Sequence, residues 1–244
     1  MKLGDVVRFY DEFVKHQQRV AFNERHRFLY RILREEGLRK DSRVLEVGCG
    51  IGVMTALMAS RVKSGRILSI DISEASVMRA KEAVRGASGL IDVVVGDATS
   101  FRANSEDFDF VTLLDVLEHI PLDRHEEVFK TVATHTGPRT KVIINIPTPE
   151  YNEYLRRHEP RELQIIDEVI PADVITRHAY KRDLVLQRFM TYGIWYEDQY
   201  QVMTFRRRQT FEKAPMRQRK IHQFRERARL VYGNVRMRIR SAGQ

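Results

Sequence analysis

The chain has 244 residues, of which 43% are hydrophobic and 31% charged, and its formal net charge is +9. This length suits one α/β domain with a sizeable core and leaves little room for a second. The one cysteine, Cys49, excludes an intramolecular disulfide, and no apolar stretch reaches the roughly 18 residues that a membrane-spanning helix needs. We therefore expect a cytoplasmic protein whose contact with a membrane would be peripheral.

The positive charge is concentrated near the C-terminal end. Residues 206–240 hold 13 Lys and Arg against 2 Glu, which leaves 29 basic and 31 acidic residues elsewhere. Apolar residues recur there at heptad-like spacing, so residues 207–244 are predicted to form a basic amphipathic C-terminal helix. Such a helix could dock on its own domain or form a homodimer, which we favour, lie on an anionic membrane surface, or bind nucleic acid.

The first 40 residues are predicted to form a helical cap. Residues 5–36 carry apolar side chains at helical spacing, and Gly37 is a typical residue for ending a helix. Beyond the cap, strands and helices alternate. Strands are predicted at 43–47, 67–71, 91–95, 108–114 and 140–146, with late strand-like runs at 184–194 and 200–206; helices are predicted at about 53–62, from Ser73 to about Arg85, and after Asp123, where Glu126 completes the spacing of a capping box.

This alternation predicts an α/β fold with a doubly wound, mostly parallel sheet of seven strands, covered by helices on both faces. The domain is expected to span residues 41–206. Within it, an insertion at 147–181 is irregular enough to cover the substrate, because specificity in such folds lies in loops.

Polar residues directly follow four of the predicted strands. The turn Gly48-Cys49-Gly50-Ile51-Gly52 follows the first, and Asp71, Asp97 and Asp115 follow the next three apolar runs. Because ligands of parallel sheets bind at the carboxyl ends of the strands, these residues are expected to share one pocket.

The pocket is better suited to a nucleoside than to a phosphate. The spacing is G-x-G-x-G instead of the dinucleotide-binding G-x-G-x-x-G, and the lysine of a P-loop is missing. A carboxylate at Asp71 can accept hydrogen bonds from ribose hydroxyls, and Asp97 can accept one from an adenine amine. A positively charged sulfonium also favours an acidic rim, so the combination fits S-adenosylmethionine.

Four motifs in order resemble those of the class I S-adenosylmethionine-dependent methyltransferases. They are Glu46 to Gly52, Ile70-Asp71-Ile72-Ser73, Val95-Gly96-Asp97-Ala98, and Phe108 to Val111 running on to Asp115-Val116-Leu117-Glu118-His119. The chain is similar to the ubiquinone-pathway, sugar and natural-product O-methyltransferases, and the family also implies an antiparallel late strand. The cofactor-binding residues that the resemblance implies are Tyr10, Glu46, Gly48, Cys49, Gly50, Asp71, Ile72, Asp97, Ala98 and Leu114.

Asp115 and His119 are the candidate catalytic residues. His119 follows the fourth strand at the rim and could act as a base on a hydroxyl acceptor, or it could merely pack against the next helix. Asp115, Glu118 and His119 resemble the E-x-x-E-H metal cluster of related O-methyltransferases, with Asp in the first place. A Mg²⁺ ion held by these three residues and His158 is therefore an alternative means of activating the acceptor.

These features predict an S-adenosylmethionine-dependent methyltransferase that methylates an oxygen of a sugar, glycan or small natural product. Two alternatives stay open. One is an RNA 2′-O-methyltransferase that uses the basic tail, and the other is a non-catalytic, cofactor-binding partner subunit.

Overall fold

The computed structural model describes residues 3–20, 22–103 and 108–210. The chain divides into two compact units, Met1–Arg208 and Gln209–Gln244. The predicted basic helix at 207–244 therefore lies almost entirely outside the described residues. Its proposed roles in dimerisation, membrane contact and nucleic-acid binding stay predictions.

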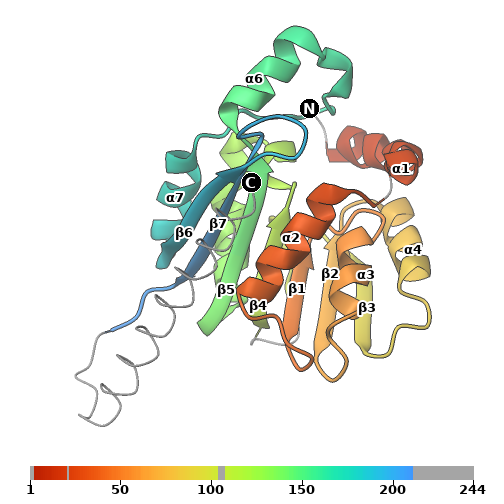
Figure 1. Cartoon of the computed structure of the whole chain (residues 1–244), viewed down its shortest axis with the longest axis vertical. Coiled ribbons are helices and arrows are strands. Elements are labelled where there is room, and N and C mark those ends of the chain that lie inside the picture. Colours follow the sequence, from red (N-terminus) through yellow and green to blue (C-terminus); the bar gives the residue numbers. More distant parts are fainter. Residues whose placement is uncertain (1–2, 21, 104–107, 211–244) are drawn as a thin grey trace, which may run out of the picture. The chain divides into compact units, whose positions relative to one another are not determined.

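A seven-stranded sheet forms the centre of the first unit (Figure 1). Its strands lie in the order β3-β2-β1-β4-β5-β7-β6, and every neighbouring pair is parallel except the two pairs made by β7. The strands are β1 (Arg43–Val47), β2 (Arg66–Asp71), β3 (Leu90–Val95), β4 (Phe108–Leu114), β5 (Thr136–Pro147), β6 (Leu184–Tyr192) and β7 (Tyr200–Arg207). The prediction of a mostly parallel sheet with an antiparallel late strand is confirmed.

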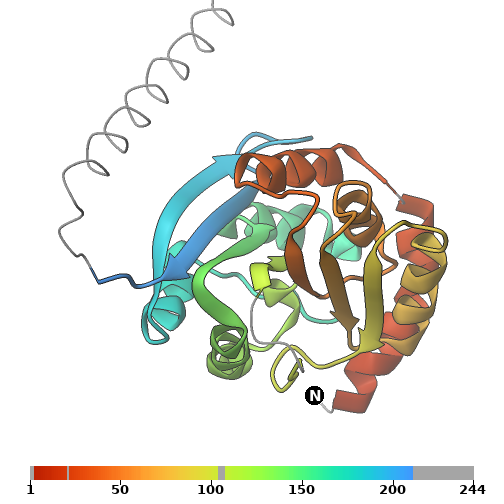
Figure 2. The ribbon, with the colours of Figure 1, turned by 90° about the horizontal axis from the view of Figure 1, so that it is seen from below.

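Helices cover both faces of the sheet, as Figures 1 and 2 show. The helices are α1 (Leu3–Val20), α2 (Glu24–Glu35), α3 (Val53–Ala59), α4 (Glu74–Ala83), α5 (His125–Thr134), α6 (Pro149–His158) and α7 (Ala172–Tyr180), with short 3₁₀ helices η1 (Leu117–His119), η2 (Leu122–Arg124) and η3 (Pro160–Glu162). The helices α2, α3 and α4 lie on one face, and α5 and α7 on the other. Among the described helices, none has the length and apolarity to cross a membrane.

The continuous apolar runs of the central strands follow from this double covering. In β1, Val44 belongs to the core that includes α2 and α3, whereas Leu45 and Val47 belong to the core that includes α5 and α7. Successive side chains of a strand point to opposite faces, so a strand buried on both sides needs apolar residues at every position. The helices α1 and α6 lie beyond the carboxyl ends of the parallel strands (Figure 1).

Most element boundaries agree with the sequence patterns, and one predicted cap is wrong. Ser73 caps α4 as expected, since its side chain accepts from the Ser76 amide at 3.0 Å. Helix α5 begins at His125, and its N-cap residue, Arg124, makes no side-chain capping bond. Asp123 lies in η2 instead, because the chain takes a separate 3₁₀ turn before α5 begins. The capping box predicted for Asp123 and Glu126 is therefore absent.

One buried and one exposed phenylalanine provide a test of the packing of the core. Phe129 in α5 is 1% exposed and stacks on His178, whereas Phe189 in β6 is 47% exposed. Phe129→Ala should lower the free energy of unfolding by about 3–5 kcal/mol, because it leaves a cavity in the core. Phe189→Ala should cost less than about 1 kcal/mol. Chemical denaturation of both variants measures the difference, and equal losses would contradict the described core.

Candidate functional site

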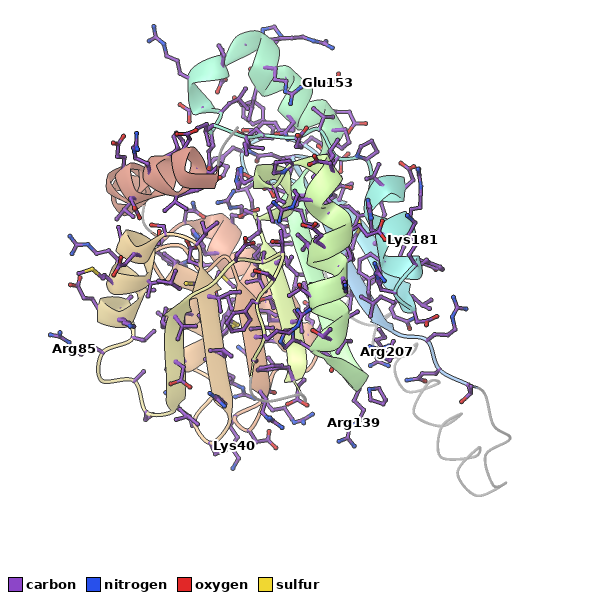
Figure 3. All side chains as sticks on the ribbon, turned by 180° about the vertical axis from the view of Figure 1, so that it is seen from behind. Lys40, Arg85, Arg139, Glu153, Lys181 and Arg207 are labelled. Carbon is purple, nitrogen blue, oxygen red and sulfur yellow. The ribbon has the colours of Figure 1, made fainter. Side chains whose placement is uncertain are left out.

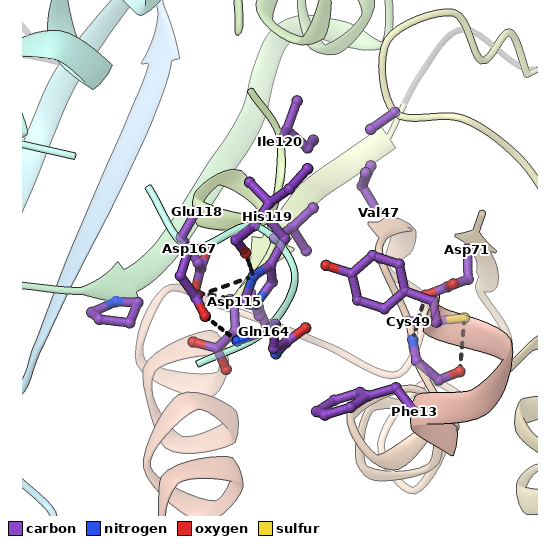
Figure 4. A pocket seen from close by; sticks show the side chains of 18 of the residues that line it. Phe13, Val47, Cys49, Asp71, Asp115, Glu118, His119, Ile120, Gln164 and Asp167 are labelled. Atoms are coloured by element: carbon purple, nitrogen blue, oxygen red, sulfur yellow. Dashed lines mark hydrogen bonds and ion pairs between the residues drawn. The ribbon is translucent and has the colours of Figure 1, made fainter. Parts of the chain in front are cut away.

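A cavity of about 790 Å³ lies at the carboxyl ends of the parallel strands (Figure 4). Segments far apart in the sequence contribute to it, from α1 and α2 to the loop after η3 and the start of β7. The predicted residues that line it are Tyr10, Glu46, Gly48, Cys49, Gly50, Asp71, Ile72, Asp97, Ala98, Leu114, Asp115, Glu118 and His119. Of the predicted site residues, only His158 is not among those that line the cavity.

The glycine turn follows β1 and packs tightly. Gly48 has φ +74°, and a Cβ there would lie 2.4 Å from Cγ2 of Val116. The Gly48 and Cys49 amides both donate to the Ile70 carbonyl, at 2.8 and 2.9 Å. Burial raises the pKa of the Cys49 thiol. Cys49 therefore stays a neutral thiol that lines the turn and does not act as a nucleophile.

Glu46 lies beneath the turn as a buried carboxyl group. It is 3% exposed and accepts hydrogen bonds from the hydroxyls of Thr55 and Ser69, both at 2.6 Å. Burial raises its pKa to about 7, although the two hydroxyls act in the opposite direction. Glu46 thereby ties β1 to β2 and α3 and fixes the base of the turn.

Asp71 and Asp97 shape the loops on either side of the cavity. The Asp71 carboxylate accepts from the Gly50 amide at 2.8 Å and from the Ser73 amide at 3.0 Å, and burial raises its pKa. Asp97 accepts from the amide and the hydroxyl of Thr99, both at 2.8 Å. A carboxylate can accept about four hydrogen bonds, so both acids keep the capacity to bind a ligand.

Tyr10 reaches into the cavity from α1. Its hydroxyl is buried and has no partner among the described residues, and its ring lies edge-on to that of His119, with 6.2 Å between centroids. Burial raises its pKa, so the phenol stays protonated. The neighbouring Asp11 accepts from the Ser73 hydroxyl at 2.6 Å and so holds α1 against the start of α4.

Asp115, predicted to be catalytic and a metal ligand, instead pairs with Arg25. The carboxylate lies 3.2 Å from the Arg25 guanidinium and accepts from the Asn145 amide at 2.7 Å. Arg25 also donates to the Tyr200 hydroxyl at 3.1 Å, and Tyr192 donates to Asn145 at 2.9 Å. Asp115 has φ +59°, and its charge is balanced by Arg25 within this network. Its catalytic assignment stays a prediction.

Glu118, His119 and Asp167 form a second charged cluster (Figure 4). The Nδ1 atom of His119 lies 2.8 Å from the Ile166 carbonyl and 3.2 Å from the Asp167 carboxylate, and its Nε2 atom lies 4.0 Å from Glu118. Burial alone would lower the pKa of His119, but Glu118 and Asp167 outweigh it and raise that pKa to about 9. Burial also raises the pKa of Glu118, whereas the charge of His119 acts in the opposite direction. The neighbouring carboxyl groups thus favour the protonated imidazole of His119, which is a poor base.

The residues do not fit the predicted Mg²⁺ site. The carboxylate of Asp115 is taken up by Arg25 and Asn145, and His119 carries a proton on the nitrogen that faces Ile166. His158 is exposed at the end of α6, where its ring contacts Tyr154 at 4.8 Å. Within residues 3–20, 22–103 and 108–210, no group of three or more His, Cys, Asp or Glu could hold a metal ion.

Several lining residues carried no recognisable sequence motif. They are Arg25, Trp195 and Tyr200, together with Tyr151, Asn152, Gln164 and Asp167 of the insertion that was predicted at 147–181 to cover the substrate. Asn145, which orients Asp115 without lining the cavity, did carry a signal, because it is the one polar residue in the apolar run 142–146 at the end of β5. The others come from segments whose positions depend on tertiary packing.

Comparisons with known proteins agree with this architecture. A methyltransferase domain family model matches residues 44–139. An indolepyruvate C-methyltransferase of Streptomyces griseus is 29% identical over 146 residues, which are 52% of this chain and 44% of that protein. A demethylmenaquinone methyltransferase of Staphylococcus aureus is 28% identical over 103 residues, 42% of each protein.

The fold also matches solved structures. The N-methyltransferase NodS of Bradyrhizobium japonicum, solved with S-adenosylhomocysteine, superposes with a TM-score of 0.65 at 17% identity, over 84% of this chain and 99% of that one. The chain spans less than half the length of the curated relatives named above. The sequence motifs and the strand order agree with the match of residues 44–139 to the methyltransferase domain family, and the fold is that of the class I S-adenosylmethionine-dependent methyltransferases.

Proposed function

We propose that the protein transfers a methyl group from S-adenosylmethionine to an oxygen of a sugar, glycan or other small hydroxylated natural product. The observation that carries the proposal is the position of two unpaired polar atoms. The Tyr10 hydroxyl and the Oε2 atom of Glu118 are buried without partners among the described residues, and both residues line the same cavity as the glycine turn. Buried polar groups normally have partners, so these two are expected to bind a ligand.

The residues around the glycine turn fit the cofactor. Gly48 and Gly50 have positive φ, which glycine adopts without strain, and both line the cavity. Asp71 would hold the ribose, and Asp97 with Ala98 would hold the adenine. When bound, S-adenosylmethionine supplies an electrophilic methyl group on a sulfonium, and the acidic surroundings favour that positive charge.

On the acceptor side, we propose Glu118 as the proton acceptor in place of His119. The acceptor hydroxyl would donate to Glu118, whose carboxylate takes the proton as the oxygen–methyl bond forms and the carbon–sulfur bond breaks. His119, held by Asp167 and Ile166, would stabilise the ionised carboxylate of Glu118. Tyr10 would orient the reacting groups from the other side.

The charge of the cavity favours small neutral or cationic acceptors over RNA. Nine carboxylic acids line it against two arginines: Glu46, Asp71, Asp97, Asp115, Glu118, Asp123, Glu159, Glu162 and Asp167 against Arg25 and Arg124. Arg25 is already paired with Asp115. A phosphate backbone would meet net repulsion there, so we rank RNA methylation below a small-molecule acceptor.

Methylation of carbon is a second candidate. The two curated relatives are named for an indolepyruvate and a demethylmenaquinone, both of which contain flat rings. Tyr151, Trp195 and Tyr200 line the cavity and could stack on such a ring.

The cytoplasmic location and the homodimer stay proposals that rest on sequence composition and on the undescribed tail.

The ribose assignment predicts the effect of Asp71→Asn. Removal of the charge should weaken the affinity for S-adenosylhomocysteine by about 10- to 100-fold, because charge-assisted hydrogen bonds to the ribose are lost. Isothermal titration calorimetry measures the dissociation constant. Asp173→Asn, at an exposed ion pair on α7, is the matched control and should not alter it. An unchanged affinity in Asp71→Asn would refute the assignment.

The role of Glu118 predicts a pH profile. Burial raises the pKa of Glu118 and its ionised form is the active one, so kcat/KM should rise with pH as Glu118 loses its proton and then level off. Glu118→Gln should lower kcat by about 100-fold and abolish this rise. Glu153→Gln, on the exposed side of α6, should keep the wild-type profile.

Tight cofactor binding without turnover on any acceptor would favour the non-catalytic partner subunit instead.

A further inference from the structure

Unpaired polar atoms accumulate on the acceptor side of the cavity. Of the nine buried side-chain atoms without a hydrogen-bond partner among the described residues, five belong to residues that line it: Tyr10, Arg25, Glu118, Asn152 and Gln164. The proposed reaction uses Tyr10 and Glu118. The Oδ1 atom of Asn152 and the Oε1 atom of Gln164 remain without a role. Both belong to the stretch between β5 and α7.

The orientation of Asn152 is fixed by its own amide nitrogen. Asn152 is 1% exposed in α6, and its Nδ2 atom donates to the Glu168 carbonyl at 2.9 Å. A carbonyl oxygen can only accept, so the nitrogen must face Glu168. The opposite atom of the amide, Oδ1, is therefore a hydrogen-bond acceptor that the described residues leave unpaired.

The loop at 164–168 brings Gln164 to the acceptor side of the cavity, where Asn152 also lies. The Gln164 amide donates to the Asp167 carboxylate, and Asp167 in turn pairs with His119. The Glu168 amide donates to the Glu118 carbonyl at 2.7 Å. Figure 4 shows Gln164 and Asp167 beside His119 and Glu118. The loop therefore ties Asn152, Gln164 and Glu118 to one another on the acceptor side.

The side chains of Asn152, Gln164 and Glu118 restrict the chemistry of the acceptor that can bind to them. Each offers an oxygen that accepts a hydrogen bond, at least once Glu118 is ionised. A ligand that satisfies them must present several donors close together, as adjacent hydroxyls of a sugar ring do. Tyr151 and Trp195 line the same cavity and can cover the apolar face of such a ring. A flat quinone or keto acid has too few donors.

We propose that Asn152 and Gln164 determine specificity by binding hydroxyls next to the one that is methylated, and that the acceptor is a polyol such as a pyranose or a cyclitol. This inference rests on the proposed methyltransferase function. It narrows that function to acceptors with neighbouring free hydroxyls.

The test measures S-adenosylhomocysteine release by the full chain on two groups of acceptors. The first contains methyl pyranosides, their monodeoxy analogues and myo-inositol; the second contains indole-3-pyruvate and a demethylmenaquinol. The variants are Gln164→Met, which removes the acceptor atom at similar size, and Asn152→Ala. Gln187→Met, at an exposed position of β6, is the matched control. Thermal unfolding shows that each variant is folded.

We expect turnover on at least one polyol, with KM raised about 10- to 100-fold in Gln164→Met and kcat little changed. Gln187→Met should stay close to wild type. One monodeoxy analogue should lose a similar factor with the wild-type chain and no further factor with Gln164→Met, because the missing hydroxyl and the missing oxygen are partners. A second analogue should behave in the same way with Asn152→Ala.

Three results would overturn the inference without refuting the binding of the methyl donor in this cavity. These are equal kinetics of wild type and Gln164→Met on a polyol, turnover of the flat acceptors alone, and binding of S-adenosylhomocysteine without turnover of any polyol. Failure to bind S-adenosylhomocysteine would refute the proposed function itself.

Discussion

The site depends on the close contact between Gly48 and Val116. The turn after β1 lies so near the segment after β4 that a Cβ on Gly48 would fall 2.4 Å from Cγ2 of Val116. Val116 directly precedes η1, which carries Glu118 and His119. The proposed cofactor-binding turn therefore packs against the segment that carries the proposed acceptor-binding residues. Methyl transfer requires the donor and the acceptor to lie next to each other, as this contact allows.

Two partly buried charge networks hold the segments around this contact together. Arg25 and Asp115, supported by Asn145 and Tyr200, join α2 to the ends of β4, β5 and β7. The cluster of Glu118, His119 and Asp167 joins η1 to the insertion. Figure 3 draws the side chains of the described residues from behind. Breaking one partner of a buried pair leaves an uncompensated charge, so these pairs fix geometry more than they add stability.

Sequence patterns predicted the parts of the structure that local rules determine. The alternation of strands and helices follows from the apolar patterns. The rule that loops after parallel strands share one rim predicts that the glycine turn, Asp71 and Asp97 lie together, and all three line the cavity. The role of Asp115 could not be predicted, because its partner Arg25 lies 90 positions earlier in a helix with no motif. The spacing of Asp115, Glu118 and His119 suggested a metal, whereas distant partners give each of them another task.

The central claim is that one cavity holds the methyl donor between Asp71 and Asp97 and presents it to Glu118. A crystal structure of the full chain with S-adenosylhomocysteine tests this most directly. The account predicts ribose hydroxyls on the Asp71 carboxylate, the adenine beside Asp97 and Ala98, and the sulfur facing Tyr10 and Glu118. A ligand bound elsewhere, or one whose sulfur points away from Glu118, would contradict it.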